Sequence, residues 1–218
     1  MKMFKIEGIP GPGATFYSAV VVKSPIMKDF YHLVVAEVLS KLPSGRILDI
    51  GTGPGDIPLE LAKSSKGLEI KAIDISPAMV DIARQNSRKM GLQGRVEFSF
   101  GSAEKIPFPN GYFDLVLSAN SFHHWAEPQK CLKEIQRVLK NGGEAWIYDL
   151  RYDLTGEVKR ATRKKYGWLM SSLFLYFVRL HSSLRAQDVQ KILSSPGLGY
   201  SSTGLTDRGI ILKQKLRK

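Results

Sequence analysis

The stretch RILDIGTGPGD, from Arg46 to Asp56, determines the fold that we predict for this chain. A short apolar run leads into three glycines at alternate positions, and a segment with helical spacing of apolar residues follows. This pattern predicts a buried strand, a turn where main chain passes close to a ligand, and a helix. Asp56 is expected to cap the helix, with Pro58 in its first turn. A strand, glycine turn and helix in this order favour a nucleotide-like ligand at the strand's carboxyl end.

The spacing of the glycines leaves two interpretations of that ligand. A dinucleotide fingerprint needs Gly-x-Gly-x-x-Gly, whereas the third glycine here, Gly55, comes one residue early. An acidic residue, Asp49, also stands inside the strand. This Asp-x-Gly-x-Gly-x-Gly arrangement resembles the first motif of class I S-adenosylmethionine-dependent methyltransferases, and a nicotinamide cofactor is the alternative. The resemblance implies that the methionine end of the cofactor is held by Asp49, Gly51, Thr52, Gly53 and Gly55.

A second strand is expected from Leu68 to Ile75, followed by Ser76 as a helix N-cap and Pro77 as the first helical residue. Asp74 then lies at the carboxyl end of the neighbouring strand, where a carboxylate can accept two hydrogen bonds from a ribose diol. We therefore predict that Asp74 and Ile75 contact the ribose. The alternative is that Asp74 only begins the turn.

A third strand, Arg95 to Phe100, leads into Ser102 and Ala103. This segment resembles the methyltransferase stretch that contacts adenine, although family members most often have Asp where this chain has Ser102. A serine hydroxyl can accept from the exocyclic amine, but it is a weaker partner than a carboxylate. The resemblance further implies that Asn120, after the fourth strand, lies at the reacting end of the cofactor.

Three further sequence segments indicate which branch of the methyltransferases the chain resembles. They are Tyr112 to Val116, the pair His123-His124, and Leu139 to Gly143, and they look like the small-molecule branch of this class, which includes ubiquinone/menaquinone-type enzymes. The resemblance covers residues 28–150. We expect a helix over 128–139, with 141–143 as its C-cap.

Composition indicates a soluble globular protein. At 218 residues, 43% hydrophobic and 24% charged, the chain is long enough for one filled core and short for two domains. The single cysteine, Cys131, excludes an internal disulfide framework and a multi-cysteine zinc site. No apolar run has the length of a signal peptide or a membrane span, so a cytoplasmic location is expected.

The excess positive charge lies in the last third of the chain. Residues 151–218 hold fourteen Lys and Arg against four Asp and Glu. Such asymmetry is typical of a surface for nucleic acid or an anionic membrane, and the alternative is a basic tail that only aids solubility. The apolar block 168–180 follows basic residues 159–165 and is too short to span a bilayer. It is expected to form a lid over an apolar acceptor, a membrane-surface helix, or an ordinary core helix.

These patterns together predict one α/β domain over residues 1–218. The fold class is a three-layer α/β/α sandwich with a Rossmann-like, seven-stranded, mostly parallel sheet and a C-terminal antiparallel hairpin. Its parts are an N-terminal lead-in and helix (1–45), a cofactor-binding core (46–150), a variable substrate-covering insertion (151–182), and a last helix with the closing hairpin (183–218). Aromatic residues of the N-terminal segment, Tyr17, Phe30 and Tyr31, are candidates for ligand contact or for packing.

His123 and His124 are the candidate catalytic residues. Methyl transfer from a sulfonium needs in-line placement and exclusion of water, and a hydroxyl, thiol or acidic carbon acceptor also needs a base. Histidine suits that role near neutral pH, although the pair could equally cover the cofactor with aromatic surface. His32 and His181 lie on other segments, so no metal site is predicted.

The leading hypothesis is a methyltransferase that uses S-adenosylmethionine and acts on a small, apolar or quinone-like acceptor. Peripheral contact with an anionic membrane is a further expectation. One alternative is an RNA methyltransferase guided by the basic C-terminal third, although no RNA-binding module is visible. Another is a non-catalytic protein that only binds S-adenosylmethionine.

Overall fold

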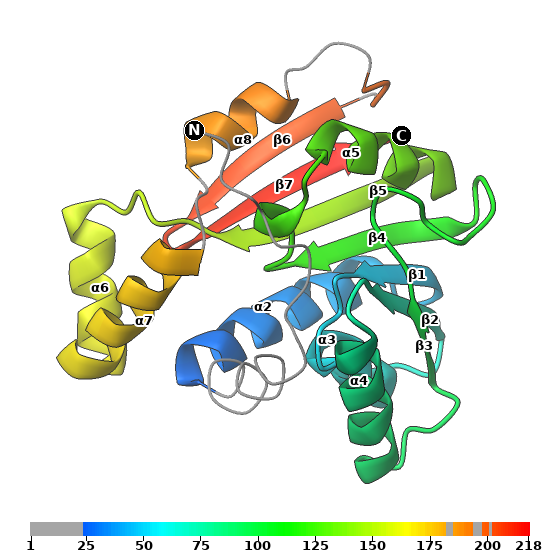
Figure 1. Ribbon diagram of the computed structural model, residues 1–218, viewed down its shortest axis with the longest axis horizontal. Coiled ribbons are helices and arrows are strands. Elements are labelled where there is room, and N and C mark those ends of the chain that lie inside the picture. Colours follow the sequence, from blue (N-terminus) through cyan, green and yellow to red (C-terminus); the bar gives the residue numbers. More distant parts are fainter. Residues whose placement is uncertain (1–23, 182–184, 194–197, 201) are drawn as a thin grey trace.

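A single mixed sheet organises the residues that the computed structural model describes, which are 24–181, 185–193, 198–200 and 202–218 (Figure 1). Within them the sheet has seven strands in the order β3-β2-β1-β4-β5-β7-β6. The first five pair in parallel, whereas β7 runs antiparallel to both β5 and β6. The strands are β1 (Gly45–Ile50), β2 (Leu68–Asp74), β3 (Val96–Phe100), β4 (Phe113–Ala119), β5 (Leu139–Leu150), β6 (Ser202–Arg208) and β7 (Ile211–Arg217).

The helices cover both faces of this sheet. Their bounds are α2 (Pro25–Lys41), α3 (Asp56–Ser64), α4 (Pro77–Lys89), the 3-10 turn η2 (Phe122–His124), α5 (Pro128–Val138), α6 (Gly156–Tyr166), α7 (Trp168–His181) and α8 (Ala186–Leu193). Successive residues of a strand point to opposite faces, so Ile47 belongs to the core cluster that contains residues of α2, α3, α4 and α7, whereas Leu48 belongs to the cluster that contains residues of α5 and α8. The predicted three-layer fold, with its parallel core and antiparallel hairpin, is confirmed.

The strand order reverses between β1 and β4, which positions the site. The chain moves outward from β1 through β2 to β3, then returns to place β4 on the other side of β1. The loops that leave the carboxyl ends of β1 and β4 therefore diverge to opposite faces. In open α/β sheets the crevice created at such a point is where ligands bind.

Most element boundaries agree with the sequence patterns, including Ser76, whose hydroxyl accepts from the Met79 amide as an N-cap. Two capping predictions were wrong. Gly55, in the left-handed region at φ 86°, is the N-cap of α3, and Asp56 is its first helical residue. Residues 141–143 belong to β5 rather than to a helix C-cap, because the strand begins at Leu139 and its register against β4 shifts between Phe113 and Leu115. The pairing of β5 with β7 begins only at Glu144, and just before it the Gly142 amide donates to the Lys218 carbonyl while the Lys218 amide donates to the Gly143 carbonyl.

Some predictions fall outside the described residues. The lead-in before residue 24, with Tyr17, and the first residues of the last predicted part (183–218) belong to this group. Among the described helices, none combines the length and the apolar character needed to cross a bilayer.

Candidate active site

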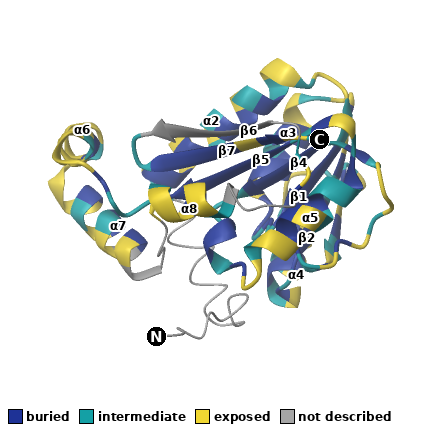
Figure 2. Ribbon diagram, turned by 90° about the horizontal axis from the view of Figure 1, so that it is seen from above, coloured by how far each residue is buried: buried dark blue, intermediate teal, exposed yellow. Residues whose placement is uncertain are grey.

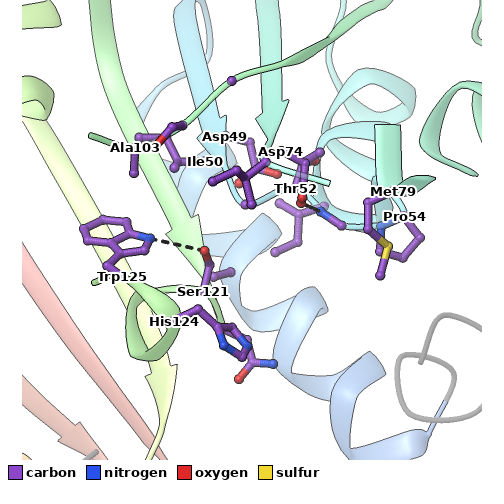
Figure 3. A pocket seen from close by; sticks show the side chains of 18 of the residues that line it. Asp49, Ile50, Thr52, Pro54, Asp74, Met79, Ala103, Ser121, His124 and Trp125 are labelled. Atoms are coloured by element: carbon purple, nitrogen blue, oxygen red, sulfur yellow. Dashed lines mark hydrogen bonds between the residues drawn. The ribbon is translucent and has the colours of Figure 1, made fainter. Parts of the chain in front are cut away.

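A pocket opens at the carboxyl ends of β1, β2 and β4, at the reversal of strand order (Figure 3). Its walls come from the glycine loop, the turns after β2 and β3, and the loop after β4. Nine of the ten predicted cofactor residues line it, namely Asp49, Gly51, Thr52, Gly53, Asp74, Ile75, Ser102, Ala103 and Asn120. Four segments that are distant in sequence are thereby brought to one cavity.

The three glycines of the loop have different structural roles. A Cβ on Gly51 would lie 2.0 Å from Ser121 Oγ, so this glycine lets the loop after β4 approach the loop after β1. Gly53, at φ 54°, lines the pocket, and a Cβ there would meet no atom within 4 Å. Gly55 lies outside the pocket lining, and a Cβ on it would lie 3.0 Å from the Phe98 ring, so this glycine lets the loop pack against β3. Gly53 is therefore the glycine whose bare main chain faces open space.

Asp74 connects the end of β2 to the glycine loop. Its Oδ2 accepts from the Gly53 amide at 2.8 Å and its Oδ1 accepts from the Ser76 amide at 2.9 Å. The carboxylate thus begins the turn, as one of the two interpretations predicted, and it also lines the pocket. Each carboxylate oxygen can accept a second hydrogen bond, so the pair of oxygens retains capacity for two hydroxyl donors.

Asp49 and Asp74 give the pocket an excess of negative charge. Asp49 is 2% exposed, and burial, together with the charge of Asp74, raises its pKa to about 7. Burial likewise raises the pKa of Asp74, although its two backbone hydrogen bonds oppose the shift. Within the part of the chain that the structure describes, neither carboxylate has an ion-pair partner. A ligand that carries positive charge would relieve this desolvation, and S-adenosylmethionine has both an ammonium and a sulfonium.

Thr52 offers a second sign that the pocket is built for a polar ligand. The residue is 8% exposed, and its hydroxyl, which acts on the Asp49 carboxyl to lower the pKa of that group, makes no hydrogen bond of regular geometry among the described residues. A buried polar atom without a partner costs free energy of about 1–3 kcal/mol. A ligand with hydrogen-bonding groups at this end of the pocket would satisfy it.

The predicted adenine segment forms a tight turn after β3. Ser102 Oγ accepts from the Glu104 amide at 3.1 Å, and Ala103 is part of the buried core beneath the turn. Glu104 also lines the pocket while its carboxylate pairs with Lys130 at 2.7 Å. The Ser102 hydroxyl is therefore already engaged with its own turn, yet it keeps one lone pair and its proton.

The loop after β4 forms the opposite wall. Asn120 has φ 56°, the left-handed region that Asn tolerates better than most residues, and its amide donates to the Tyr148 carbonyl. Among the described residues it is the only non-glycine with positive φ. Trp125 Nε1 donates to Ser121 Oγ at 3.3 Å, the contact drawn in Figure 3. This turn brings the loop against Gly51 and closes one side of the cavity.

The two histidines occupy different environments. His124 lines the pocket, whereas His123 is 7% exposed and does not. His123 Nδ1 lies 2.8 Å from Asp149 Oδ1, and its amide donates to Asp149 Oδ2 at 3.0 Å. The two imidazole rings are 4.0 Å apart between centroids. Among the described residues no three His, Cys, Asp or Glu side chains cluster as metal ligands.

Sequence reasoning missed Asp149, which is fully buried near the end of β5. The available signal was an acidic residue inside an apolar strand, the same signal that identified Asp49 on β1. Of the aromatic candidates on α2, Tyr31 lines the pocket and Phe30 is in the core. Cys131, expected to be a packing residue, is buried on α5 and also reaches the pocket wall.

Comparison with known families agrees with this geometry. The family described as "Methyltransferase domain" matches residues 48–147, which run from the second half of β1 through most of β5. The matched segment holds nearly all of the pocket lining, including both carboxylates and His124, and it also contains His123.

Named relatives share this same segment. A demethylmenaquinone methyltransferase from Thermus thermophilus is 42% identical over 111 residues, which cover 51% of this chain and 49% of the relative. A ubiquinone/menaquinone biosynthesis C-methyltransferase from Geotalea daltonii is 36% identical over 108 residues, or 49% and 46% of the two chains. The chain therefore spans about half the length of the relatives it matches.

The fold extends the likeness over nearly the whole chain. A proposed S-adenosyl-L-methionine-dependent methyltransferase from Methanococcus maripaludis superposes with a TM-score of 0.77 at 23% identity, covering 100% of this chain and 97% of its own. The predicted family and its cofactor, S-adenosylmethionine, are confirmed. Residues 48–147 of this chain are a class I S-adenosylmethionine-dependent methyltransferase domain, similar to those of the ubiquinone/menaquinone enzymes.

Proposed function

We propose that this chain transfers a methyl group from S-adenosylmethionine to a small aromatic acceptor of the quinol type. The observation that carries the proposal is one pocket with two buried, unpaired carboxylates beside an open glycine turn and a histidine on its opposite wall. The names of the relatives, which act on demethylmenaquinone or in ubiquinone and menaquinone synthesis, favour a quinone-type acceptor.

The cofactor residues divide into three groups by the part of the ligand that each would meet. Asp49, Thr52 and the main chain of Gly53 would hold the methionine end, with the charge of Asp49 opposite the ammonium. Asp74 would accept from the ribose hydroxyls with the lone pairs that its backbone donors leave open. Ser102 and Ala103 would meet the adenine, and Asn120 the reacting end.

The bound cofactor would supply an electrophilic methyl group on a sulfonium. A quinone ring carbon is itself electron-poor, so the nucleophile has to be the reduced quinol. Loss of one hydroxyl proton makes the adjacent ring carbon electron-rich. That carbon forms the new bond to the methyl as the bond to sulfur breaks, and its own hydrogen then leaves as a proton. Two protons are thus released and the hydroxyl regains one.

His124 is the pocket residue that we propose as acceptor of the hydroxyl proton, because it is the histidine on the cavity wall. His123 would position it, since its own ring is fixed by Asp149 and packs against His124. A positioned base contributes on the order of 10²–10⁴ in rate. Exclusion of water by Tyr31 and Trp125 at the wall would protect the sulfonium from hydrolysis.

The cofactor assignment is tested by thermal shift with S-adenosylmethionine, S-adenosylhomocysteine and NAD. The first two should raise the melting temperature and NAD should not. Asp74→Ala should lose most of this ligand-induced rise, whereas Asp81→Ala, an exposed aspartate on α4, should keep it. Because Asp74 also holds two backbone amides, the rise is measured against each variant's own ligand-free melting temperature. A rise with NAD alone would refute the assignment.

The acceptor is tested with demethylmenaquinone reduced to its quinol, incubated with S-adenosylmethionine and the chain. Mass spectrometry should find a quinol that has gained one methyl group together with S-adenosylhomocysteine. The oxidised quinone should give no product, because its ring carbon is not nucleophilic. Methyl incorporation into RNA in place of the quinol would favour the RNA alternative. Cofactor binding with no product from any acceptor would favour the non-catalytic one.

A further inference from the structure

The hairpin of α6 and α7 carries most of the large apolar side chains that are strongly exposed among the described residues. It follows β5 at the carboxyl edge of the sheet and extends beyond the rest of the molecule (Figures 1 and 2). Five of the seven large apolar side chains that are strongly exposed in the described residues lie on α7. They are Trp168 (67%), Leu169 (74%), Met170 (41%), Leu173 (69%) and Tyr176 (62%).

The arrangement of these residues on α7 shows two opposite apolar faces. Ser171, Phe174 and Val178 recur at helical spacing and are buried, the last two within the core that includes α2 and β5. Leu169, Leu173 and Tyr176 recur at the same spacing on the other side and are exposed. The inner face accounts for the attachment of α7 to the fold. The outer face has no counterpart among the described residues, and an exposed apolar patch of this kind marks an interaction site.

The charge on α6 identifies the kind of partner. Lys159, Arg160, Arg163 and Lys164 are exposed and, at spacing i, i+1, i+4 and i+5, occupy one side of the helix. Lys165 points elsewhere and pairs with Asp29 of α2 at 2.8 Å. The helix has one acidic residue, Glu157. A stripe of cations beside a helix with exposed leucines and aromatics is complementary to anionic headgroups over acyl chains.

We propose that the α6–α7 hairpin docks on an anionic lipid bilayer, with the outer face of α7 in the headgroup boundary and the α6 cations on the lipid phosphates. Trp168 and Tyr176 suit that boundary, because their rings are apolar and their N–H and O–H groups remain hydrated. The contact is peripheral, since no described helix can span the bilayer.

The docking surface is connected to the pocket through α2. Tyr166 at the end of α6 donates to Asp29 at 2.7 Å, and Tyr31, two residues along α2, lines the pocket. No described residue of α6 or α7 lines the pocket itself, so the connection between the hairpin and the pocket runs through α2. Docking would hold the pocket edge of the sheet near the membrane surface.

The experiment is co-sedimentation of the full chain with vesicles, without cofactor or acceptor, so that its result does not depend on the proposed activity. The chain should bind phosphatidylcholine vesicles that contain phosphatidylglycerol and should not bind pure phosphatidylcholine. Leu169→Glu with Leu173→Glu should weaken binding at least tenfold by placing charge in the apolar boundary. Arg163→Ser with Lys164→Ser should weaken it about fivefold per cation, and less at high salt.

The matched controls are Met90→Glu, an exposed apolar residue at the end of α4, and Arg88→Ser with Lys89→Ser beside it. Both should bind as the unaltered chain does. All substituted side chains are exposed, so far-ultraviolet circular dichroism and melting temperature should show that every variant folds.

Three outcomes would overturn the proposal. If the chain bound neither kind of vesicle, the proposed docking would be wrong. If the α7 variants and the α4 controls lost binding equally, the α6–α7 hairpin would not be a specific docking surface. Binding that depends on the cations but not on the leucines would indicate a general polyanion site, with RNA as the competing partner. A dimer that Leu169→Glu with Leu173→Glu converts to a monomer, without vesicle binding, would assign the face to a second copy of this chain.

Discussion

The carboxylate of Asp149 holds the ring of His123 at 2.8 Å, although the two residues lie 26 positions apart on β5 and η2. Asp149 is fully buried, and it also accepts from the amides of His123 and Leu150. Three donors around one carboxylate fix both the ring and the short turn that carries it. Because His124 packs on this ring and faces the pocket, the contact between Asp149 and His123 fixes the position of the His124 ring, the proposed base.

Asp149→Asn tests that arrangement. The amide has the size of the carboxylate but can donate to His123 Nδ1, which would change the tautomer of the ring. We expect the turnover rate with the quinol to fall by about tenfold to a hundredfold, with the dissociation constant for S-adenosylhomocysteine unchanged. The dependence of the turnover rate on pH should also be shifted relative to that of the unaltered chain. Asp153→Asn, the same change at a residue that pairs with Arg151 instead, is the control. An unaltered rate would assign the histidine pair to packing alone.

The raised pKa of Asp49 predicts how stability depends on pH. An aspartate titrates near 3.8 without perturbation, whereas in the fold the pKa of Asp49 is about 7. Between these values the folded protein binds a proton that the unfolded chain has lost, so the free energy of unfolding should decrease as pH rises through that window. Urea unfolding from pH 5 to 8 measures this slope. Asp49→Asn should make the slope shallower, and an identical slope would show that Asp49 does not titrate in this range.

Cofactor affinity should have the opposite pH dependence. A cationic ligand favours the ionised carboxylate, so binding releases the proton from Asp49 and becomes tighter as pH rises. Below pH 7 the gain should approach about tenfold per pH unit, and above it the gain should disappear. Calorimetry in buffers of different ionisation enthalpy measures the proton release directly. Asp49→Asn should bind more weakly at pH 8 and show no such release.

Gly53→Ala tests whether Gly53 is needed for cofactor binding or only for the stability of the fold. The new Cβ would meet no protein atom, so the change should cost about 1–2 kcal/mol of stability from the left-handed backbone alone. We expect the thermal shift with S-adenosylmethionine to be lost, because the methyl group would occupy pocket space. Gly91→Ala has a similar φ of 67° and equally open surroundings at the end of α4, away from the pocket. It should cost the same stability and keep the shift. If both variants lost the thermal shift, backbone strain would be responsible rather than the methyl group in the pocket.

The two faces of α7 should differ sharply in their contribution to stability. Phe174→Ala removes a ring that is 7% exposed and packs in the core, so it should lower the free energy of unfolding by about 3–5 kcal/mol. Leu173→Ala, beside it but 69% exposed, should change it by less than about 0.5 kcal/mol. Denaturant unfolding of both variants gives the comparison. Equal losses would mean that the outer face is covered by protein in solution.

The amino-acid sequence by itself determined the parallel core and the placement of two carboxylates beside the glycine turn. The run before Gly51 is apolar because β1 is buried on both faces, and such a strand leaves a local signature that needs no tertiary contact. Glycines at positive φ and carboxylates at strand ends are local in the same way, so the positions of Asp49 and Asp74 followed from spacing. Composition likewise separated the basic α6 and the apolar α7 from the rest of the chain.

Only the tertiary structure decided what these residues meet. Spacing could not show that Gly55 packs against Phe98 instead of lining the pocket, nor that Asp149 reaches His123, because both contacts join segments distant in sequence. It also could not assign the two faces of α7, since a helix with apolar residues on both sides has no clear periodic pattern to orient it and burial depends on where α2 and the sheet lie. Long-range packing, which no local pattern encodes, therefore selected His124 for the pocket and left Leu169 and Leu173 exposed.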